Sequence, residues 1–237
     1  MSTPLPSLTL HTYFRSSCSG RLRIALALKN LPYTTHPVNL LSGAQHTPAH
    51  LSLNPSGTVP VLTATTTNPT TGTEETLTIT QSIAALEYLE ELTDTIPLLP
   101  PRTEIDKRAR IRTLVNILAC DVQPVTNLKI QKRVKALGGD NTAWARELMV
   151  EGFTAVEAIL AGSTTAGTGT AGKYCVGDEV SLADVCLVPA VWAGERVGVE
   201  FDKFPCVKRV FGEMEGLEGV KVAHWMRQGD TPVELRG

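Results

Sequence analysis

The order in which strand-like and helical patterns follow one another constrains the fold of this chain most. Four short β-prone stretches all lie before Gln81, namely Leu8 to Thr12, Tyr33 to Val38, Val59 to Leu62 and Leu77 to Thr80. Helical spacing follows over Arg21 to Lys29, Thr47-Pro48 resembles a capped helix start, and an apolar stripe begins at Ile83. The first part of the chain is therefore predicted to have the element order βαβαββα.

Beyond Thr93 the apolar residues recur only at helical spacing. Three prolines indicate a linker, and two later stripes have a helical period. The prolines are Pro97, Pro100 and Pro101, and the stripes are Ile111, Leu114, Val115 and Leu118, then Met149, Phe153, Val156 and Leu160. We predict an α/β domain over 1–93, a linker over 94–104 and an all-α domain over 105–237.

Two segments of low complexity interrupt this pattern. Thr63 to Thr76 is rich in Thr, Asn, Pro and Gly, and is predicted to be a long polar connection between two strands. Ala161 to Gly172 is a Gly/Thr/Ala stretch and is predicted to be a loop. Neither segment carries a functional prediction.

Composition excludes several classes of function. A net charge of -2 gives no electrostatic case for nucleic acid, so an acidic small molecule would need a local basic pocket. The longest apolar runs fall well short of the roughly 20 residues of a membrane span, and the first residues lack the features of a secretion signal. The five cysteines show no spacing typical of a disulfide scaffold or a zinc site. We expect a cytoplasmic protein without a metal.

The segment Ser16-Ser17-Cys18 lies between the first strand and the first helix. Hydroxyls and backbone N–H groups at a helix N-terminus favour anions, including a thiolate. Ser16 or Ser17 could instead only cap the helix, and Cys18 could be a small buried residue or a redox thiol. Arg21 stands where a two-cysteine motif would have its second cysteine, so a thioredoxin mechanism is not expected.

The run from Ser16 to Leu26 closely resembles the signature of zeta-class glutathione transferases, the class that contains the maleylacetoacetate isomerases. Gly20 departs from it, since an aromatic residue or histidine is common there. The resemblance implies a thioredoxin-like N-terminal domain and an all-helical C-terminal domain, which is the glutathione transferase fold. It also implies reduced glutathione as cosubstrate and a homodimer. The reacting sulfur would then be that of glutathione, held by Ser16 or Ser17 together with Cys18, with Arg21 beside them.

Further matches follow in register. Asn54 to Pro60 resembles the segment in which a Val before a cis proline pairs with the cysteinyl amide of glutathione, which assigns this role to Val59 and predicts a cis bond at Pro60. Gln81-Ser82 is similar to the pair that holds the γ-glutamyl group, and Gln45 aligns with a residue at the glycyl end. Without the resemblance, Pro60 would be an ordinary strand-start proline and Ser82 an N-cap.

The C-terminal part continues the resemblance. Gln123 to Leu128 is similar to the family's Gln-Pro-x-x-Asn-Leu run, whose Gln and Asn reach toward glutathione, which assigns that role to Gln123 and Asn127. Arg196 matches an arginine for a substrate carboxylate; taken alone, these residues would be a helix kink and a surface charge. Ser181 and Asp184 form a capping motif assigned to folding. The tail Asp230 to Arg236 also resembles the isomerases.

The resemblance implies that maleylacetoacetate is isomerised to fumarylacetoacetate, a step of tyrosine and phenylalanine catabolism. The glutathione thiolate would add to the cis double bond, the adduct would rotate and elimination would give the trans product. Arg21 and Arg196 would hold substrate carboxylates. Alternatives are conjugation or dehalogenation of small α-halo acids, thiol exchange through Cys18, and a non-enzymatic binding module.

Overall fold

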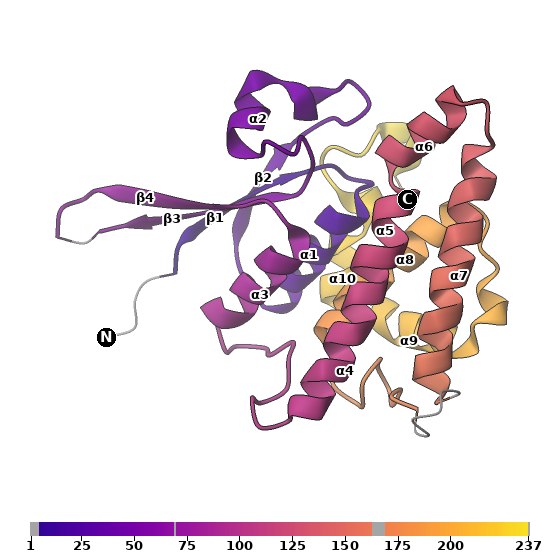
Figure 1. Cartoon of the computed structure of the whole chain (residues 1–237). Coiled ribbons are helices and arrows are strands. Elements are labelled where there is room, and N and C mark those ends of the chain that lie inside the picture. The colour runs from indigo at the N-terminus through magenta and orange to yellow at the C-terminus, as the bar shows by residue number, and fades with distance from the viewer. Residues whose placement is uncertain (1–4, 69, 163–168, 237) are drawn as a thin grey trace. The chain divides into compact units, whose positions relative to one another are not determined.

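The computed structural model describes residues 5–68, 70–162 and 169–236 (Figure 1). The chain divides into two compact units. The first comprises Met1–Ile96 together with Glu218–Gly237, and the second comprises Pro97–Leu217. The C-terminal segment therefore belongs with the N-terminal residues, which differs from the predicted helical domain over 105–237.

The first unit is built around a four-stranded mixed sheet with strand order β2-β1-β3-β4. Strand β1 is parallel to β2 and antiparallel to β3, which in turn is antiparallel to β4. The predicted order βαβαββα is confirmed. The elements are β1 (Ser7–Thr12), α1 (Ser17–Leu28), β2 (Tyr33–Pro37), α2 (Pro48–Leu53), β3 (Val61–Thr67), β4 (Glu74–Ile79) and α3 (Ser82–Leu92).

Buried and more exposed side chains alternate along the central strands, and the buried ones form the core of this unit. Leu10 of β1 pairs in register with Leu62 of β3, and both are fully buried. Helices α1 and α3 pack side by side, with Leu22 and Leu86 inside, while α2 lies on the other side of the sheet (Figure 1). This packing does not require apolar residues at the starts of α1 and α3, which can therefore carry polar groups.

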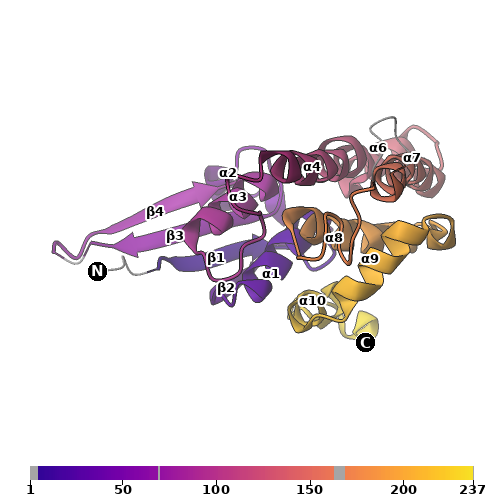
Figure 2. The ribbon, with the colours of Figure 1, turned by 90° about the horizontal axis from the view of Figure 1, so that it is seen from below.

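The threonine-rich segment is mostly strand, so the prediction of a long connection over 63–76 is wrong. Strands β3 and β4 continue past the start of β1 at Ser7 as a two-stranded ribbon, in which Thr67 pairs with Glu74 (Figures 1 and 2). The hydroxyls of Thr65 and Thr76 are hydrogen-bonded across the ribbon at 2.9 Å. Threonine is β-branched and suits a strand, so a polar composition alone was misleading.

The C-terminal segment of the first unit contains α10 (Glu218–Ala223) and the 3₁₀ turns η4 (Trp225–Arg227) and η5 (Val233–Leu235). Helix α10 packs against α1. A side chain at Gly219 would place its Cβ 3.0 Å from Leu28 Cδ2, so glycine permits the close approach of the two helices. This packing explains why the segment is part of the first unit.

The second unit is all-helical, as predicted. Its helices are α4 (Ile105–Asn116), the π-helical η2 (Ile117–Val122), α5 (Gln123–Thr126), α6 (Leu128–Ala136), α7 (Asn141–Ala161), α8 (Leu182–Arg196), the 3₁₀ turn η3 (Phe201–Lys203) and α9 (Pro205–Glu215). Helix α8 is buried from Leu182 to Gly194 and is the centre of this unit. In the described ranges no helix is long and apolar enough to cross a membrane.

Two sequence features of the second unit have clear structural counterparts. The Asp184 carboxylate accepts hydrogen bonds from the backbone N–H of Ser181 at 2.8 Å and from its hydroxyl at 2.7 Å, which confirms the capping motif. Burial raises the pKa of this carboxyl. Helix α7 continues to Ala161 and ends at Gly162 in a left-handed conformation, with φ of 77°. The rest of the low-complexity loop includes 163–168, which lie outside the described residues.

Candidate active site

The turn between β1 and α1 places the Ser-Ser-Cys segment at a helix N-terminus. The Ser16 side chain accepts a hydrogen bond from the Ser19 N–H at 3.2 Å, so Ser16 is the N-cap and α1 begins at Ser17. The helix therefore starts four residues before the predicted Arg21. The cap occupies an acceptor position of the Ser16 hydroxyl and leaves its O–H able to donate to an anion.

Gly20 does not disturb the helix. It is buried within α1, and its N–H donates to the Ser16 carbonyl at 2.9 Å. One turn of regular helix thus follows the cap, and the N–H groups of this turn point toward the Ser16–Cys18 end. The half-buried Cys18 has its Sγ 3.8 Å from Nη1 of Arg21.

Arg21 connects the starts of two helices. Its guanidinium is buried, and Nη1 donates to Ser82 Oγ at 3.1 Å. Ser82 is the first residue of α3, and Gln81 occupies the N-cap position without a side-chain capping bond among the described residues. The interpretation of Ser82 as an N-cap is therefore wrong, because its hydroxyl is turned to Arg21. Gln81, Ser82 and the Ser16–Cys18 turn are brought together through one guanidinium.

The loop before β3 presents Val59. The Val59-Pro60 peptide bond is cis, as predicted. Because β3 begins at Val61, the peptide groups of Val59 precede the strand and are not part of its ladder. The Val59 side chain is buried in a cluster with Tyr13 and Phe14, which directly precede the Ser16 turn. The structure therefore brings Val59 to the same end of the sheet as the start of α1.

Gln45 lies beside this loop in the 3₁₀ turn η1 (Ala44–His46). A side chain at Gly57 would place its Cβ 2.9 Å from His46 Nδ1 and 3.4 Å from the Gln45 carbonyl oxygen, so η1 rests on the turn before Val59. The side-chain Oε1 of Gln45 is buried and has no hydrogen-bond partner within the described part of the chain. Such an orphaned acceptor fits an N–H group of a ligand.

The remaining predicted residues belong to the second unit. Gln123 is half-buried at the start of α5. Asn127 is the N-cap of α6, since its Oδ1 accepts from the Ile130 N–H at 3.0 Å while its Nδ2 donates to the Pro124 carbonyl at 2.9 Å. Arg196 is exposed in the last turn of α8, and its Nη1 donates to the Trp192 carbonyl at 2.9 Å. Their contact with a ligand stays a prediction.

Residues 15–92 match the glutathione S-transferase N-terminal domain, and residues 147–218 match the glutathione S-transferase C-terminal domain. The chain belongs to the glutathione S-transferase family. Its relatives include a probable glutathione S-transferase of Coccidioides immitis, 58% identical over 98% of both chains. A maleylacetoacetate isomerase of Aspergillus fumigatus is 54% identical over 98% of this transferase and 96% of its own length.

Solved structures agree with the fold of this transferase. A bacterial maleyl pyruvate isomerase, described as a zeta-class glutathione S-transferase, matches with a TM-score of 0.82 and 34% identity, over 94% of this chain and 100% of its own. A maleylacetoacetate isomerase from Methylobacterium extorquens, with bound malonate and glutathione, matches with a TM-score of 0.81 and 31% identity, over 95% of this chain and 100% of its own. The zeta class named from the sequence is confirmed.

The first unit of this transferase has features that fit a γ-glutamyl tripeptide. The peptide groups of Val59 lie ahead of the β3 ladder, Gln45 offers a buried acceptor, and the capped start of α1 is suited to a sulfur anion. Ser82 and Gln81 begin a second helix, whose first N–H groups suit a carboxylate. The residues present therefore fit glutathione.

Sequence reasoning missed the residues that support this site. Asn54 is buried and holds the loop before Val59 through hydrogen bonds to Thr58, and His50 Nε2 also contacts the Thr58 carbonyl at 2.9 Å. The ring of His50 lies 6.4 Å from that of His11, and burial is the main cause that lowers the pKa of His11 to about 4. Asn54 stood within the matched motif, but nothing local distinguished it from an ordinary loop residue.

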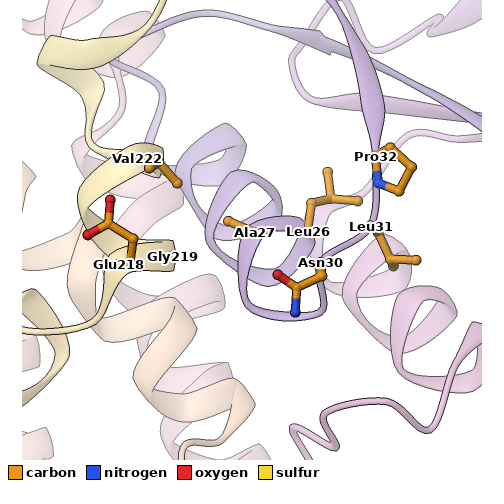
Figure 3. Close-up of a pocket in the computed structure, with 8 residues that line it drawn as sticks. All are labelled: Leu26, Ala27, Asn30, Leu31, Pro32, Glu218, Gly219 and Val222. Carbon is orange, nitrogen blue, oxygen red and sulfur yellow. The ribbon is translucent and has the colours of Figure 1, made fainter.

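A shallow hollow in the first unit lies away from this chemistry (Figure 3). Its volume is about 410 Å³, and its lining comes from the C-terminal end of α1, the segment after it, and α10. The lining residues are Leu26, Ala27, Asn30, Leu31, Pro32, Glu218, Gly219 and Val222. Since α1 rises about 1.5 Å per residue, this end is more than 10 Å from Ser17. The hollow is not part of the candidate site.

Proposed function

We propose that this transferase is a glutathione-dependent cis-trans isomerase that converts maleylacetoacetate to fumarylacetoacetate. The observation that carries the proposal is the Ser16-Ser17-Cys18 segment at the capped start of α1, joined by buried Arg21 to Ser82. The isomerase of Aspergillus fumigatus, 54% identical, supports the substrate assignment. The reaction is a step of tyrosine and phenylalanine catabolism.

The first unit supplies the groups that hold the glutathione backbone. The N–H and C=O of Val59, ahead of Pro60, pair with the cysteinyl residue as a short added strand. Gln81 and Ser82 at the start of α3 receive the γ-glutamyl carboxylate and amine, and Gln45 receives the glycyl end. Gln123 and Asn127 are assigned further polar contacts with glutathione, as the family resemblance implies. Asn127 retains one amide N–H after its two capping bonds.

The start of α1 stabilises the thiolate of glutathione. A hydroxyl of Ser16 or Ser17 donates to the sulfur, and the first-turn N–H groups add a favourable field. A hydrogen bond to a charged group contributes about 1.5 to 3 kcal/mol, which lowers a thiol pKa by about one to two units. Cys18 lies beside these serines as a half-buried side chain.

The chemistry needs only addition and elimination. The thiolate forms a C–S bond to one carbon of the cis double bond, and the π electrons move to the adjacent carbonyl as an enolate. The former double bond is then single and rotates. The enolate electrons return, the C–S bond breaks and the trans product leaves with the thiolate regenerated. Exposed Arg196 is suited to a substrate carboxylate, whereas Arg21 acts through Ser82 at the glutathione end.

The direct test is fumarylacetoacetate formation with and without glutathione. We expect turnover only with glutathione, loss of most activity in Ser16→Ala or Ser17→Ala, and retained isomerisation in Cys18→Ala. Turnover without glutathione would contradict the proposal. Loss in Cys18→Ala together with intact serine variants would instead favour thiol exchange through Cys18.

Conjugation is a second candidate, because the relative from Coccidioides immitis is described as a probable glutathione S-transferase. A small α-halo acid needs the same thiolate and the same grip on a carboxylate. Release of halide from such an acid, measured beside isomerisation on one preparation, compares the two activities. We expect both, with isomerisation the faster.

We infer further that the protein works in the cytoplasm as a homodimer on a small acidic substrate. The family resemblance supports the dimer, and the acidic substrate accords with the arginines named above. Size-exclusion chromatography with light scattering is expected to give twice the mass of the 25.5 kDa chain. Fluorescence of a tagged chain in intact cells tests the compartment.

A further inference from the structure

The C-terminal segment of the first unit reaches back to the turn that carries the candidate thiolate site. The backbone N–H of Phe14 donates to Asp230 Oδ2 at 2.9 Å, across 216 residues of sequence. Phe14 lies two residues before Ser16, and the Ser16 N–H is itself bonded to the Tyr13 carbonyl at 3.0 Å. Asp230 is therefore separated from the Ser16 cap by one short, hydrogen-bonded turn.

A second buried group also holds this turn. Arg23 of α1 donates to the Phe14 carbonyl at 2.9 Å, to the Tyr13 carbonyl at 3.4 Å, and to Thr12 Oγ1 at 3.1 Å. It also donates to the Ala223 carbonyl at 3.2 Å. Burial lowers the pKa of Arg23 to about 10, and the negative charge of Asp230 is among the effects that oppose this. The guanidinium stays charged at neutral pH, and the carboxylate compensates part of its charge.

The tail that carries Asp230 is braced by its own hydrogen bonds. Thr231 Oγ1 donates to the Trp225 carbonyl, and Arg236 donates through Nε to the Thr231 carbonyl at 2.9 Å and through Nη2 to the Gly229 carbonyl at 3.0 Å. Trp225 packs against the cluster of Tyr13, Phe14, Val38 and Val59. The tail thus contacts two elements of the candidate site, the Ser16 turn and the Val59 loop.

We propose that Asp230 is a positioning residue for the glutathione thiolate site, acting on the Ser16 turn through the Phe14 peptide group. The proposal rests on the proposed function, since it concerns the same site. Asp230 does not touch the reacting atoms. Its carboxylate fixes one end of the Tyr13–Ser16 turn while Arg23 fixes the carbonyls, so that the hydroxyls and N–H groups at the start of α1 keep one orientation toward the sulfur.

The geometry makes this more than a packing role. Oδ1 of Asp230 is buried and has no hydrogen-bond partner in the described part of the chain, so this carboxylate is kept in a costly place. The hydrogen bond from the Phe14 N–H and the nearby positive charge of Arg23 offset the cost of burying this carboxylate. An asparagine keeps the shape but removes the charge that faces Arg23, whereas an alanine removes both interactions.

The test uses the full chain with Asp230→Ala, Asp230→Asn and a matched control, Glu234→Ala, which removes an exposed carboxylate from the same tail. The thiolate of bound glutathione absorbs ultraviolet light more strongly than the thiol does, so a pH titration of the enzyme with glutathione alone measures the pKa of the bound thiol. Glutathione affinity and isomerase kcat and KM are measured in parallel. Thermal unfolding identifies any variant that fails to fold.

We expect Asp230→Ala to weaken glutathione binding about tenfold and to raise the pKa of the bound thiol, with a smaller change in Asp230→Asn and none in Glu234→Ala. If Asp230→Ala does not fold, Asp230→Asn is expected to show the same two changes, weaker glutathione binding and a higher pKa of the bound thiol, at a smaller size. A folded Asp230 variant with a wild-type thiol titration would overturn the inference, as would an equal change in Glu234→Ala. A wild-type protein that forms no bound thiolate would remove the proposed function itself, and this inference with it.

Discussion

Removal of the Asn54 side chain should loosen the loop that presents Val59. The side chain is 1% exposed and makes three hydrogen bonds. Its Nδ2 donates to the Thr58 carbonyl at 2.9 Å and to Thr58 Oγ1 at 3.0 Å, and its Oδ1 accepts from the Ser56 N–H at 3.0 Å. Asn54→Ala removes all three at once.

The magnitude follows from what each partner loses. Three neutral hydrogen bonds contribute about 0.5 to 1.5 kcal/mol each, or about 1.5 to 4.5 kcal/mol together. The Thr58 carbonyl keeps its contact with His50 Nε2, and Ser56 is exposed, so its N–H can turn to water. Neither group pays the full cost of an unsatisfied buried atom. We therefore expect a loss of about 2 to 3 kcal/mol in the free energy of unfolding.

Urea unfolding measures this loss as a shift of the transition midpoint while the slope stays unchanged. Calorimetry measures glutathione affinity on the same preparations. Asn54→Asp keeps the acceptor but loses both donors and turns a carboxylate oxygen toward the Thr58 carbonyl, so its loss should be at least as large as that of Asn54→Ala. Ser52→Ala removes an exposed hydrogen bond to the Ala49 carbonyl in the neighbouring α2 and serves as the control. A stability loss below about 1 kcal/mol with unchanged glutathione affinity would refute the reasoning.

Three further outcomes are expected. The pKa of His11 is about 4 in the folded protein and the ordinary 6.5 in the unfolded chain. The free energy of unfolding should therefore fall as the pH falls from 6.5 to about 4. In urea titrations at several pH values, His11→Gln should show a smaller fall over this range. Lys29→Met should cost about 3 to 5 kcal/mol, because the buried ammonium contacts Glu90 at 2.8 Å and two backbone carbonyls, whereas the exposed Lys203→Met should leave the urea midpoint unchanged. Asp184→Ala should cost about 3 kcal/mol or more, measured in the same way, and Asp184→Asn should cost less because it keeps one acceptor.

Local pattern predicted the architecture because its signals are short-range. The alternation over β1, the helical spacing after it and the Thr47-Pro48 helix start depend on neighbours within a few residues. The same holds for the Ser16 cap, which satisfies an N–H three residues away. The threonine-rich ribbon was missed because polarity was weighed above the β-branched preference of its residues.

The family resemblance, in contrast, predicted features that no local signal decides. Among these were the cis bond at Pro60 and the approach of Val59 to the Ser-Ser-Cys turn. It did not predict that the hydroxyl of Ser82 faces Arg21, 61 residues earlier, instead of capping its own helix. A buried guanidinium selects its acceptor after the helices have packed.

The sequence by itself determined the order of the elements and the all-helical second unit. Only the tertiary structure decided that the last twenty residues belong with the first unit, that Asp230 holds the Phe14 N–H, and that Arg23 holds the carbonyls beside it. The reason is physical. Helical periodicity states which face of α10 is apolar but not which helix will cover it, and a buried charge acquires its partners only when distant segments meet.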